Sequence, residues 1–416
     1  MEDNMKYGLI GDRLVHSFSK EVHGMLADYE YNLCEIAKDK LDGFMTRRNF
    51  KAINVTIPYK EAVIPYLSYI SEEAKRIGSV NTIVNRGGSL CGYNTDFFGM
   101  KSQIDKMRLS LKGKKTVILG TGGTSKTAFA VAESLGADPI IKVSRSVKDG
   151  AISYEELYRD HTDAKILINT TPVGMYPDNY SSPIDLDTFK ELEGVVDAIY
   201  NPIRTKLVVE ALERGIVAEG GLYMLVAQAV YASEIFLETK YTVERLTKIY
   251  KKIRRRKENI VLIGMPASGK STLANLLSKD LSRPVMDTDT MIVSSRKKSI
   301  SNIFSEEGED TFRDYETEEI ANVSLLNNSI IATGGGAILR KENVRMLKQN
   351  GVLFFINRPY EKLLPTVNRP LASSKEAIKK RYEERYCLYL DAADVVIDAD
   401  DIPTKIAQKI TGVFYK

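Results

Sequence analysis

Residues 264 to 272 have the types and the spacing of a phosphate-binding loop. They read Gly-Met-Pro-Ala-Ser-Gly-Lys-Ser-Thr, after an apolar run at 260–263 and before a helical pattern. In such a loop the backbone amides surround nucleotide phosphates, the lysine reaches the β and γ groups, and the following hydroxyl holds Mg²⁺. The pattern predicts an ATP and Mg²⁺ site in which Lys270 and Ser271 take these two roles. The other loop residues expected at the nucleotide are Ala267, Ser268, Gly269 and Thr272.

A second glycine-rich turn lies far upstream, at Gly120, Thr121, Gly122, Gly123 and Thr124. An apolar run at 115–120 ends in this turn, and we expect a helix to begin near Ser125. Backbone amides at the start of that helix would face the pyrophosphate of a dinucleotide. Two nucleotide sites of different kinds indicate two enzymes in one polypeptide.

The end of the next apolar run indicates which dinucleotide binds. An NAD site normally has an acidic residue there for the ribose diol, whereas this chain has Ser144 and Arg145. A hydroxyl and a guanidinium suit a 2′-phosphate, so we predict NADP. The alternative is that Arg145 is a solvated residue at a strand end.

A set of small polar residues before residue 100 could hold a compact polyhydroxylated acid by directional hydrogen bonds. Each has an ordinary structural alternative. A Ser-x-Ser pair is often a helix cap, Asn-Thr-Asp is often a turn, and a lone lysine is often a surface residue. The set comprises 16–19 (His-Ser-Phe-Ser), 54–60 (Asn-Val-Thr-Ile-Pro-Tyr-Lys), 80–82 (Val-Asn-Thr) and 94–96 (Asn-Thr-Asp).

The elements that position these residues follow an α/β pattern, because short apolar runs alternate with helical patterns. We expect parallel sheets covered by helices, with strands at 6–11, 54–57, 115–120, 140–143, 166–169, 195–197 and 260–264 and a helix at about 221–239. A basic run at 248–257 marks the predicted boundary between two modules. It could contact nucleic acid or anionic lipid, but a solvated helix end or linker is the commoner explanation.

With the glycine turn and the blocks at 168–175 (Ile-Asn-Thr-Thr-Pro-Val-Gly-Met) and 221–229 (Gly-Leu-Tyr-Met-Leu-Val-Ala-Gln-Ala), the polar set resembles the shikimate dehydrogenase family over residues 5 to 250. The resemblance implies a split substrate domain, 1–100 and 221–247, around a Rossmann-type NADP-binding domain, 101–220. It implies Lys60 and Asp96 as the catalytic pair and adds Gly221 to the cofactor site. The substrate residues that it implies are Ser17, Ser19, Thr56, Lys60, Asn81, Asp96, Tyr200 and Gln228. Lys20 and Leu14 stand where the family commonly has proline, which alters the stiffness of their loop.

An ordered set downstream of the phosphate loop resembles shikimate kinase over residues 258–416, a P-loop kinase domain with a parallel sheet. Its blocks are 287–289 (Asp-Thr-Asp), 312–316 (Phe-Arg-Asp-Tyr-Glu), 333–337 (Thr-Gly-Gly-Gly-Ala), 368–371 (Asn-Arg-Pro-Leu), and Arg385 with Tyr389. Helix caps, a tight turn and surface charges are their structural alternatives.

The kinase resemblance implies a role for each polar block. Asp289 would orient or deprotonate the acceptor hydroxyl, and Asp287 would support Mg²⁺ through water. Arg313, Arg385 and the amide of Gly335 would bind the shikimate carboxylate. Arg369, on a lid, would neutralise charge on the transferred phosphoryl group. The short segment before it, 363–368, lacks the arginine that many relatives place against adenine, which leaves ATP affinity and base selectivity open.

Together the resemblances imply a bifunctional enzyme of aromatic amino-acid biosynthesis. NADPH-dependent reduction of 3-dehydroshikimate would give shikimate, and ATP would phosphorylate it to shikimate 3-phosphate. Two alternatives stay open: a second module that senses ATP without transferring phosphate, and a first module that oxidises quinate with NAD. A non-enzymatic scaffold would place no demand on Lys60, Lys270 and the paired carboxylates together.

The composition of the 416-residue chain sets broader limits. A net charge of +4 spread along the chain gives no reason to expect a nucleic-acid partner. No apolar stretch approaches the roughly 20 residues of a membrane span, and no secretory signal is evident, so we expect a cytoplasmic protein with small-molecule substrates. Its three widely spaced cysteines and three histidines suggest neither a disulfide framework nor a zinc site. An oligomer is possible.

Overall fold

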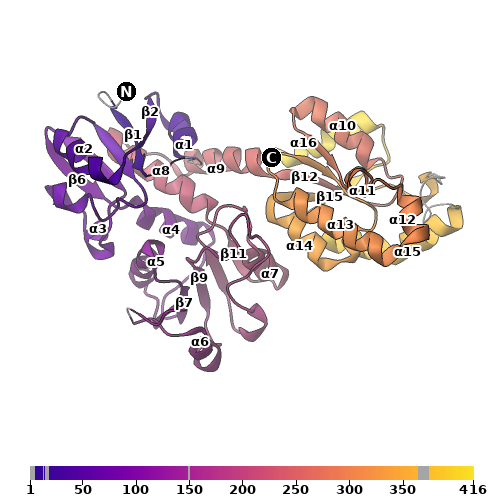
Figure 1. Ribbon diagram of the computed structural model, residues 1–416, viewed down its shortest axis with the longest axis horizontal. Coiled ribbons are helices and arrows are strands. Elements are labelled where there is room, and N and C mark those ends of the chain that lie inside the picture. Colours follow the sequence, from indigo (N-terminus) through magenta and orange to yellow (C-terminus); the bar gives the residue numbers. More distant parts are fainter. Residues whose placement is uncertain (1–4, 13, 15–17, 149, 364–373) are drawn as a thin grey trace. The chain divides into compact units, whose positions relative to one another are not determined.

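The computed structural model describes residues 5–12, 14, 18–148, 150–363 and 374–416. The chain divides into two compact units, each built from helices and β-sheets (Figure 1). Unit 1 comprises Met1–Val173, Ser182–Asn201 and Glu210–Lys252, and unit 2 comprises Gly174–Ser181, Pro202–Val209 and Ile253–Lys416. Two of the three sheets belong to unit 1 and the third belongs to unit 2.

The first sheet of unit 1 is mixed, with the strand order β2-β1-β3-β5-β6-β4. Parallel pairs join β1 to β2 and β3, whereas β5 is antiparallel to β3 and β6. The expectation of parallel sheets is therefore wrong for β5, which is antiparallel to both of its neighbours, whereas β6 is parallel to β4. Gly87 and Gly88 both have positive φ, +60° and +94°, which allows the tight hairpin between these strands. The strands are β1 (Tyr7–Gly11), β2 (Tyr31–Glu35), β3 (Ala52–Val55), β4 (Tyr69–Ile70), β5 (Thr82–Arg86) and β6 (Ser89–Tyr93).

Helices from two distant parts of the chain pack on this sheet. In helix α4 a Cβ on Gly99 would lie 2.8 Å from the Met224 carbonyl of α8, so the two helices are in close contact. Ala232 and Phe236 of α8 share a core with Leu9 of β1. Helix α8 therefore completes a domain begun by the first hundred residues (Figure 1). The helices are α1 (Ser19–Leu26), α2 (Leu41–Arg47), α3 (Glu72–Ile77), α4 (Thr95–Lys106) and α8 (Leu222–Leu237). They are followed by α9 (Val243–Lys257), whose residues up to Lys252 belong to unit 1 and whose residues from Ile253 belong to unit 2.

The second sheet of unit 1 is entirely parallel, in the order β11-β10-β9-β7-β8. The strands predicted at 140–143 and 166–169 are confirmed to the residue, as β8 and β9. Helix α5 begins at Gly123, two residues before the expected start, because Gly122 takes the N-cap position. Strands and helices here are β7 (Thr116–Leu119), β8 (Ile140–Val143), β9 (Ile166–Asn169), β10 (Gly194–Asp197), β11 (Val217–Glu219), α5 (Gly123–Ser134) and α6 (Tyr154–Asp160). Helix α7 (Lys206–Glu213) has its residues up to Val209 in unit 2 and the rest in unit 1.

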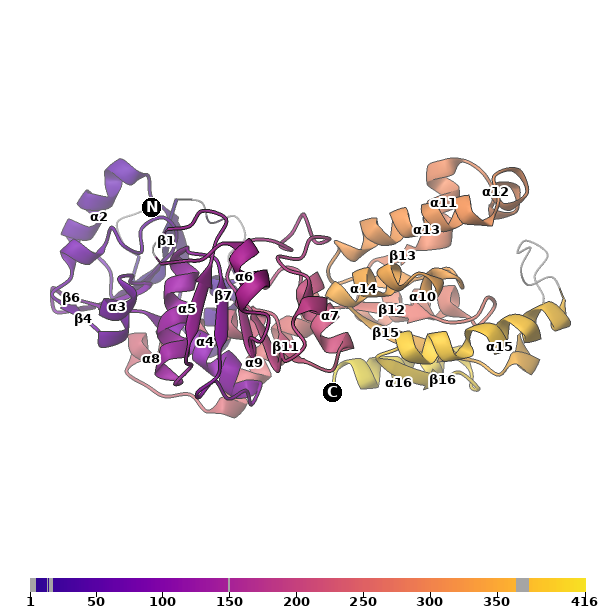
Figure 2. The ribbon, with the colours of Figure 1, turned by 90° about the horizontal axis from the view of Figure 1, so that it is seen from below.

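Unit 2 contains a parallel sheet in the order β13-β14-β12-β15-β16. Helices α10 and α16 cover one face, and α13 and α14 cover the other (Figures 1 and 2). The strands are β12 (Asn259–Ile263), β13 (Val285–Asp287), β14 (Ile330–Ala332), β15 (Gly351–Asn357) and β16 (Val395–Asp398). The helices are α10 (Lys270–Leu281), α11 (Thr288–Arg296), α12 (Ile300–Glu306), α13 (Glu309–Ser324), α14 (Lys341–Asn350), α15 (Lys375–Ala392) and α16 (Pro403–Phe414).

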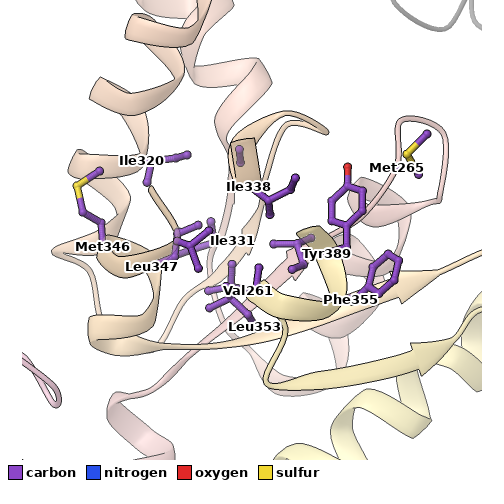
Figure 3. Close-up of a cluster of buried hydrophobic side chains, with 14 of the residues drawn as sticks. Val261, Met265, Ile320, Ile331, Ile338, Met346, Leu347, Leu353, Phe355 and Tyr389 are labelled. Atoms are coloured by element: carbon purple, nitrogen blue, oxygen red, sulfur yellow. The ribbon is translucent and has the colours of Figure 1, made fainter. Parts of the chain in front are cut away.

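The central strand β12 is buried on both faces, as expected for a strand between two helical layers. Val261 and Ile263 face a core that includes Phe355 and Tyr389, whose rings stack at 4.9 Å (Figure 3). Ile260 and the other alternate residues of β12 face α10 and α16. These two cores fix the end of β12, from which the phosphate loop leaves the sheet.

The basic run at 248–257 forms the carboxyl half of α9. The prediction of a helix end is confirmed, but its last turn is only partly solvated: Arg256 is exposed, whereas Lys257 is buried. Fully buried Glu258 accepts hydrogen bonds from Arg254 at 2.8 Å and Arg255 at 2.6 Å. Arg283 donates to the backbone carbonyls of Glu258 and Arg255, at 2.6 Å each. Among the described residues, no helix has the length and apolarity needed to cross a membrane.

Candidate functional site

Unit 1 contains a cavity of about 700 Å³ between its two sheets. Residues from both sheets and from α8 line it, including Asn54, which belongs to the polar block at 54–60 but not to the substrate residues that the family resemblance implied. The predicted residues on its wall are Ser19, Thr56, Lys60, Asn81, Asp96, Gly123, Thr124, Tyr200, Gly221 and Gln228. Ser17 lies outside the described residues.

Lys60 and Asp96 form an ion pair within this cavity. Lys60 follows β3, and Asp96 lies in the first turn of α4, whose N-cap Asn94 accepts a hydrogen bond from the Phe97 amide at 3.3 Å. The Lys60 ammonium donates to Asp96 Oδ2 at 2.6 Å, and the side chains keep 30% and 20% of their surface exposed. The pair therefore presents an oriented ammonium to a molecule in the cavity.

A buried amide fixes the start of α4. Asn81 Oδ1 accepts hydrogen bonds from the Thr95 amide at 2.7 Å and from the Thr95 hydroxyl at 3.2 Å. With its oxygen used in this way, Asn81 has its amide donors left for other partners. Gln228 of α8 reaches the same helix, because its Oε1 lies 3.5 Å from the Thr95 hydroxyl. Asn81 and Gln228, which lie far apart in the sequence, thus line the same cavity.

The opposite wall carries aromatic and hydroxyl groups. The Tyr200 ring meets Phe18 edge-on, with the ring centroids 6.1 Å apart. Burial raises the pKa of the Tyr200 hydroxyl, so at neutral pH it keeps its proton and can donate a hydrogen bond. Ser19 is the first residue of α1. These side chains can hold a hydroxylated acid through several directional contacts.

The glycine turn after β7 has the geometry of a dinucleotide site. Gly120 has φ +108°, and a Cβ there would lie 2.7 Å from Thr170 Oγ1. Gly122 caps α5 without a side chain, and neither it nor Gly123 has an atom within 4 Å of an added Cβ. The first amides of α5 are therefore open to the same cavity as Lys60. This open helix N-terminus fits a pyrophosphate.

Ser144 and Arg145 follow β8, whose carboxyl end lies at the same edge of the parallel sheet as the glycine turn. Arg145 is exposed. Gly221, at the N-cap of α8, donates its amide to Ile199 O at 2.7 Å, and a Cβ there would collide with the Ala198 carbonyl. Gly221 is therefore required by close packing at the cavity wall. The structure brings Gly120, Thr121 and Thr124 to the same edge as Ser144.

In unit 2 the phosphate loop connects β12 to α10. Ala267 and Gly269 have positive φ, +65° and +93°, which curls the loop. Buried Lys270 donates to the carbonyls of Gly264 at 2.8 Å and Met265 at 2.9 Å. Ser268 Oγ is buried and has no hydrogen-bond partner in the part of the chain that the structure describes. An unpaired hydroxyl inside a curled loop fits a phosphate oxygen.

Ser271 and Asp287 meet beside the loop. The Ser271 hydroxyl donates to Asp287 Oδ2 at 2.7 Å, while Asp287 Oδ1 caps α11 through the Thr290 amide at 3.1 Å. Thr272 follows on the exposed side of α10. A hydroxyl and a carboxylate oxygen are hard ligands of the kind that Mg²⁺ binds.

A small pocket of about 50 Å³ adjoins the loop at Pro266. Its wall includes Asp289, Arg313, Gly335 and Arg385, the four residues predicted for the acceptor. Arg385 donates to Gly335 O at 3.0 Å, and burial lowers the pKa of its guanidinium. Two guanidinium groups in the wall of a pocket can bind the carboxylate of an anionic alcohol, and the Asp289 carboxylate can accept a hydrogen bond from its hydroxyl.

Glu316 also lines this pocket, although the sequence analysis gave it no role. It is fully buried and accepts from Arg313 at 2.7 Å through Oε2. Burial raises the pKa of Glu316, and its Oε1 has no hydrogen-bond partner within the described ranges. Its position three residues after Arg313, on the same face of α13, was the available signal.

The three glycines after β14 are needed for close approach. An added Cβ on Gly334 would lie 2.6 Å from Asp289 Oδ1, and one on Gly336 would collide with the Arg313 guanidinium. The triple glycine therefore brings the backbone against Asp289 and Arg313, two residues predicted to bind the molecule that accepts the phosphoryl group. Arg369 lies outside the described residues.

Comparisons with known proteins agree with both family resemblances. Residues 9–83 match the family model of the shikimate dehydrogenase substrate binding domain, and residues 266–414 match that of shikimate kinase. The shikimate dehydrogenase (NADP(+)) of Clostridium perfringens strain 13 is 37% identical over 268 residues, which cover 60% of this chain and 98% of that protein.

Solved structures that are similar to this chain also cover 60% of it. A chorismate mutase/shikimate 5-dehydrogenase fusion protein from Clostridium acetobutylicum has a TM-score of 0.57 at 35% identity, covering 60% of this chain and 97% of the other. Shikimate 5-dehydrogenase from Thermus thermophilus, in complex with NADP(H) and shikimate, has a TM-score of 0.53 at 26% identity, covering 60% and 99%. The chain therefore belongs to the shikimate dehydrogenase family and carries a shikimate kinase domain at its carboxyl end.

Proposed function

We propose that this bifunctional enzyme of the shikimate pathway reduces 3-dehydroshikimate to shikimate with NADPH and then phosphorylates shikimate to shikimate 3-phosphate with ATP. One observation carries the proposal: the Lys60–Asp96 pair and the open N-terminus of α5 line the same cavity. A proton donor and a dinucleotide cradle around one cavity are the requirements of ketone reduction.

We further propose that the dehydrogenase module spans 1–250, with the substrate domain at 1–100 and 221–247 and the NADP-binding domain at 101–220. The kinase module would span 258–416. The whole protein would act on small molecules in the cytoplasm. It would bind neither nucleic acid nor a membrane. The pairing of Arg254 and Arg255 with Glu258 supports this, because it occupies guanidinium groups that phosphates would need.

In the dehydrogenase reaction NADPH supplies a hydride to the ketone carbon when it is bound. The Lys60 ammonium stabilises the negative charge that develops on the ketone oxygen and donates the proton to it. Asp96 orients Lys60 and accepts a hydrogen bond from a substrate hydroxyl. The other contacts to the substrate come from Ser17, Ser19, Thr56, Asn81, Tyr200 and Gln228. Ser144 and Arg145 would hold the 2′-phosphate.

In the kinase reaction the loop amides and Lys270 hold the phosphates of ATP. Ser271, and Asp287 through water, would hold Mg²⁺, which neutralises phosphate charge. Asp289 orients the acceptor hydroxyl, and Arg313, Arg385 and the Gly335 amide bind the carboxylate. Arg369 would neutralise charge on the moving phosphoryl group. Positioning and electrostatics supply most of the catalysis in such transfers.

A single reaction mixture tests both halves. Purified protein receives 3-dehydroshikimate, NADPH, Mg²⁺ and ATP, and the products are identified by mass spectrometry with each component omitted in turn. The complete mixture should give shikimate 3-phosphate, omission of ATP should give shikimate, and omission of NADPH should give neither. Consumption of NADPH without any phosphorylated product would contradict the kinase half alone.

A further inference from the structure

A buried tyrosine lies behind the dehydrogenase cavity and contacts two of the groups that line it. Tyr31 is the first residue of β2 and only 3% exposed. Its ring stacks flat on His23 of α1, with centroids 4.0 Å apart and an angle of 9° between the planes. Strand pairing with Tyr7 of β1 fixes its backbone. The Tyr31 hydroxyl is therefore held in one place by the packing of its ring.

The hydrogen bonds around Asn54 fix the direction in which this hydroxyl donates. Asn54 Nδ2 donates to Asn81 O at 3.2 Å, an atom that can only accept, and it also contacts Thr82 Oγ1 at 3.0 Å. The remaining amide atom, Oδ1, must therefore face the Tyr31 hydroxyl, which donates to it at 2.8 Å. Because the Tyr31 proton is used on Asn54, the Tyr31 oxygen is left as an acceptor.

That acceptor is used by Ser19, whose side chain hydrogen-bonds the Tyr31 hydroxyl. Burial raises the pKa of Tyr31, so it keeps its proton throughout the range in which the enzyme would work. One hydroxyl thus sets the orientation of Ser19 on α1 and Asn54 on β3. Both of these residues line the cavity.

The same chain of contacts continues toward the catalytic pair. Asn54 binds the backbone of Asn81, and the Asn81 side chain holds the Thr95 amide next to Asp96. Loss of the Tyr31 hydroxyl would remove the donor that lies 2.8 Å from Asn54 Oδ1 and would release Ser19. The groups that bind substrate would then lose their fixed orientation, while the Lys60–Asp96 contact itself would be untouched.

We propose that Tyr31 is a positioning residue for the keto acid, whose hydroxyl orients Ser19 and Asn54 for substrate binding. The inference rests on the proposed dehydrogenase function. It concerns substrate affinity rather than the chemical step, and it gives Tyr31 no contact with NADPH.

The test compares Tyr31→Phe with Tyr29→Phe in steady-state assays of 3-dehydroshikimate reduction. Tyr29 also has a partly buried hydroxyl, but its hydrogen bonds go to His23 and, at 3.2 Å, to Ser233 rather than to Ser19 or Asn54. Tyr31→Phe should raise the KM for the keto acid roughly tenfold, the size expected for one buried hydrogen bond. Its kcat should stay within about threefold, and its KM for NADPH and its kinase activity should match the parent. Tyr29→Phe should leave both KM values unchanged.

Two unnatural residues at position 31 distinguish loss of the hydrogen bond from a folding defect. Tyr31→4-fluorophenylalanine fills the space of the hydroxyl but donates no hydrogen bond, and should behave like Tyr31→Phe. Tyr31→4-aminophenylalanine retains a donor and should restore the parental KM to within about threefold.

Each remaining outcome overturns the inference in a recognisable way. Equal KM values for the Tyr31 variants and the parent would show that the hydroxyl has no positioning role, with the proposed function intact. A fall in kcat with unchanged KM, or identical effects from Tyr29→Phe, would indicate general structural damage. An inactive parent protein with normal kinase activity would refute the dehydrogenase function itself.

Discussion

The Lys60 ammonium lies 2.6 Å from the Asp96 carboxylate, although the two residues are 36 positions apart and belong to different elements. The N-terminus of α4 places Asp96, and the turn after β3 places Lys60. The pair is only partly exposed, so its geometry is set before any substrate arrives. Preorganised charge of this kind lowers the barrier for a developing alkoxide.

Lys60→Met should therefore lower the kcat of ketone reduction by about 10² to 10⁴, the usual range for loss of general acid assistance. The KM for the keto acid should change little, because the other polar side chains remain. Initial rates of NADPH oxidation measure both. Lys101→Met, which removes an exposed lysine from the same helix as Asp96, should leave the rate unchanged. Equal rates for the Lys60 variant and the parent would exclude Lys60 as proton donor.

Arg145→Ala should raise the KM for NADPH at least tenfold and leave the weak reaction with NADH unaffected. The guanidinium would bind the 2′-phosphate, which NADH lacks. The matched control is Arg159→Ala, which removes an exposed arginine from α6 after the same strand. An equal loss with both cofactors, or a parent that prefers NADH, would refute the assignment of Arg145 to NADP.

Asp289→Asn should lower the kcat of shikimate phosphorylation by at least about 10², because an amide cannot take a proton from the acceptor hydroxyl. ATP binding, measured by calorimetry, should persist. Asp280→Asn, at an exposed position of α10, is the control and should have no effect. Binding of ATP by the parent protein without any transfer to shikimate would instead support a nucleotide-sensing role for unit 2.

Gly336→Ala should raise the KM for shikimate in the kinase reaction about tenfold or more, since the new methyl group would displace the Arg313 guanidinium. The KM for ATP should be unchanged. Gly412→Ala, in α16, meets no atom within 4 Å and should stabilise the protein by up to about 1 kcal/mol. If both variants bound shikimate equally well, the close approach of Gly336 to Arg313 would have no role in binding.

Burial lowers the pKa of His23 to about 3, against 6.5 for an exposed histidine. The unfolded chain therefore binds more protons between these values, so the stability of unit 1 should be intact above pH 6.5 and should fall as the pH drops toward 3. From pH 6.5 to 5 the loss should be about 2 kcal/mol.

His23→Phe keeps the stack on Tyr31 and should flatten this dependence, although losing the contact with Tyr29 lowers its stability at pH 7. The urea midpoint for loss of dehydrogenase activity, measured at several pH values, tests the prediction. A parallel decline in the variant would assign the acid sensitivity to other groups.

Most of the fold could be predicted from the alternation of apolar runs with helical patterns, because buried parallel strands such as β8 and β9 read as short uninterrupted apolar segments. The antiparallel hairpin of β5 and β6 was missed, even though its Gly87-Gly88 turn is visible in the sequence. Strand direction depends on which neighbours pair, and the apolar pattern alone does not specify this.

The candidate site could also be predicted only in part. Residues in ordered motifs, such as Lys60 and Lys270, could be named from spacing and resemblance. Tyr31 contacts Asn54 only after folding, so no local pattern encodes that contact. Glu316 pairs with Arg313 three residues earlier on α13, and this spacing is visible in the sequence, but it does not show that the two side chains line a pocket. Motifs in the sequence therefore identified residues such as Lys60 that line the cavity, but not the buried residues, such as Tyr31, that contact the cavity wall.

The buried carboxylate of Glu258 sets a practical limit on dividing the two activities. A kinase fragment that started at residue 258 would keep this charge but remove Arg254 and Arg255, leaving an uncompensated anion in the interior. A separate kinase fragment should therefore begin no later than Ile253, which lies within α9, so that Arg254 and Arg255 are retained.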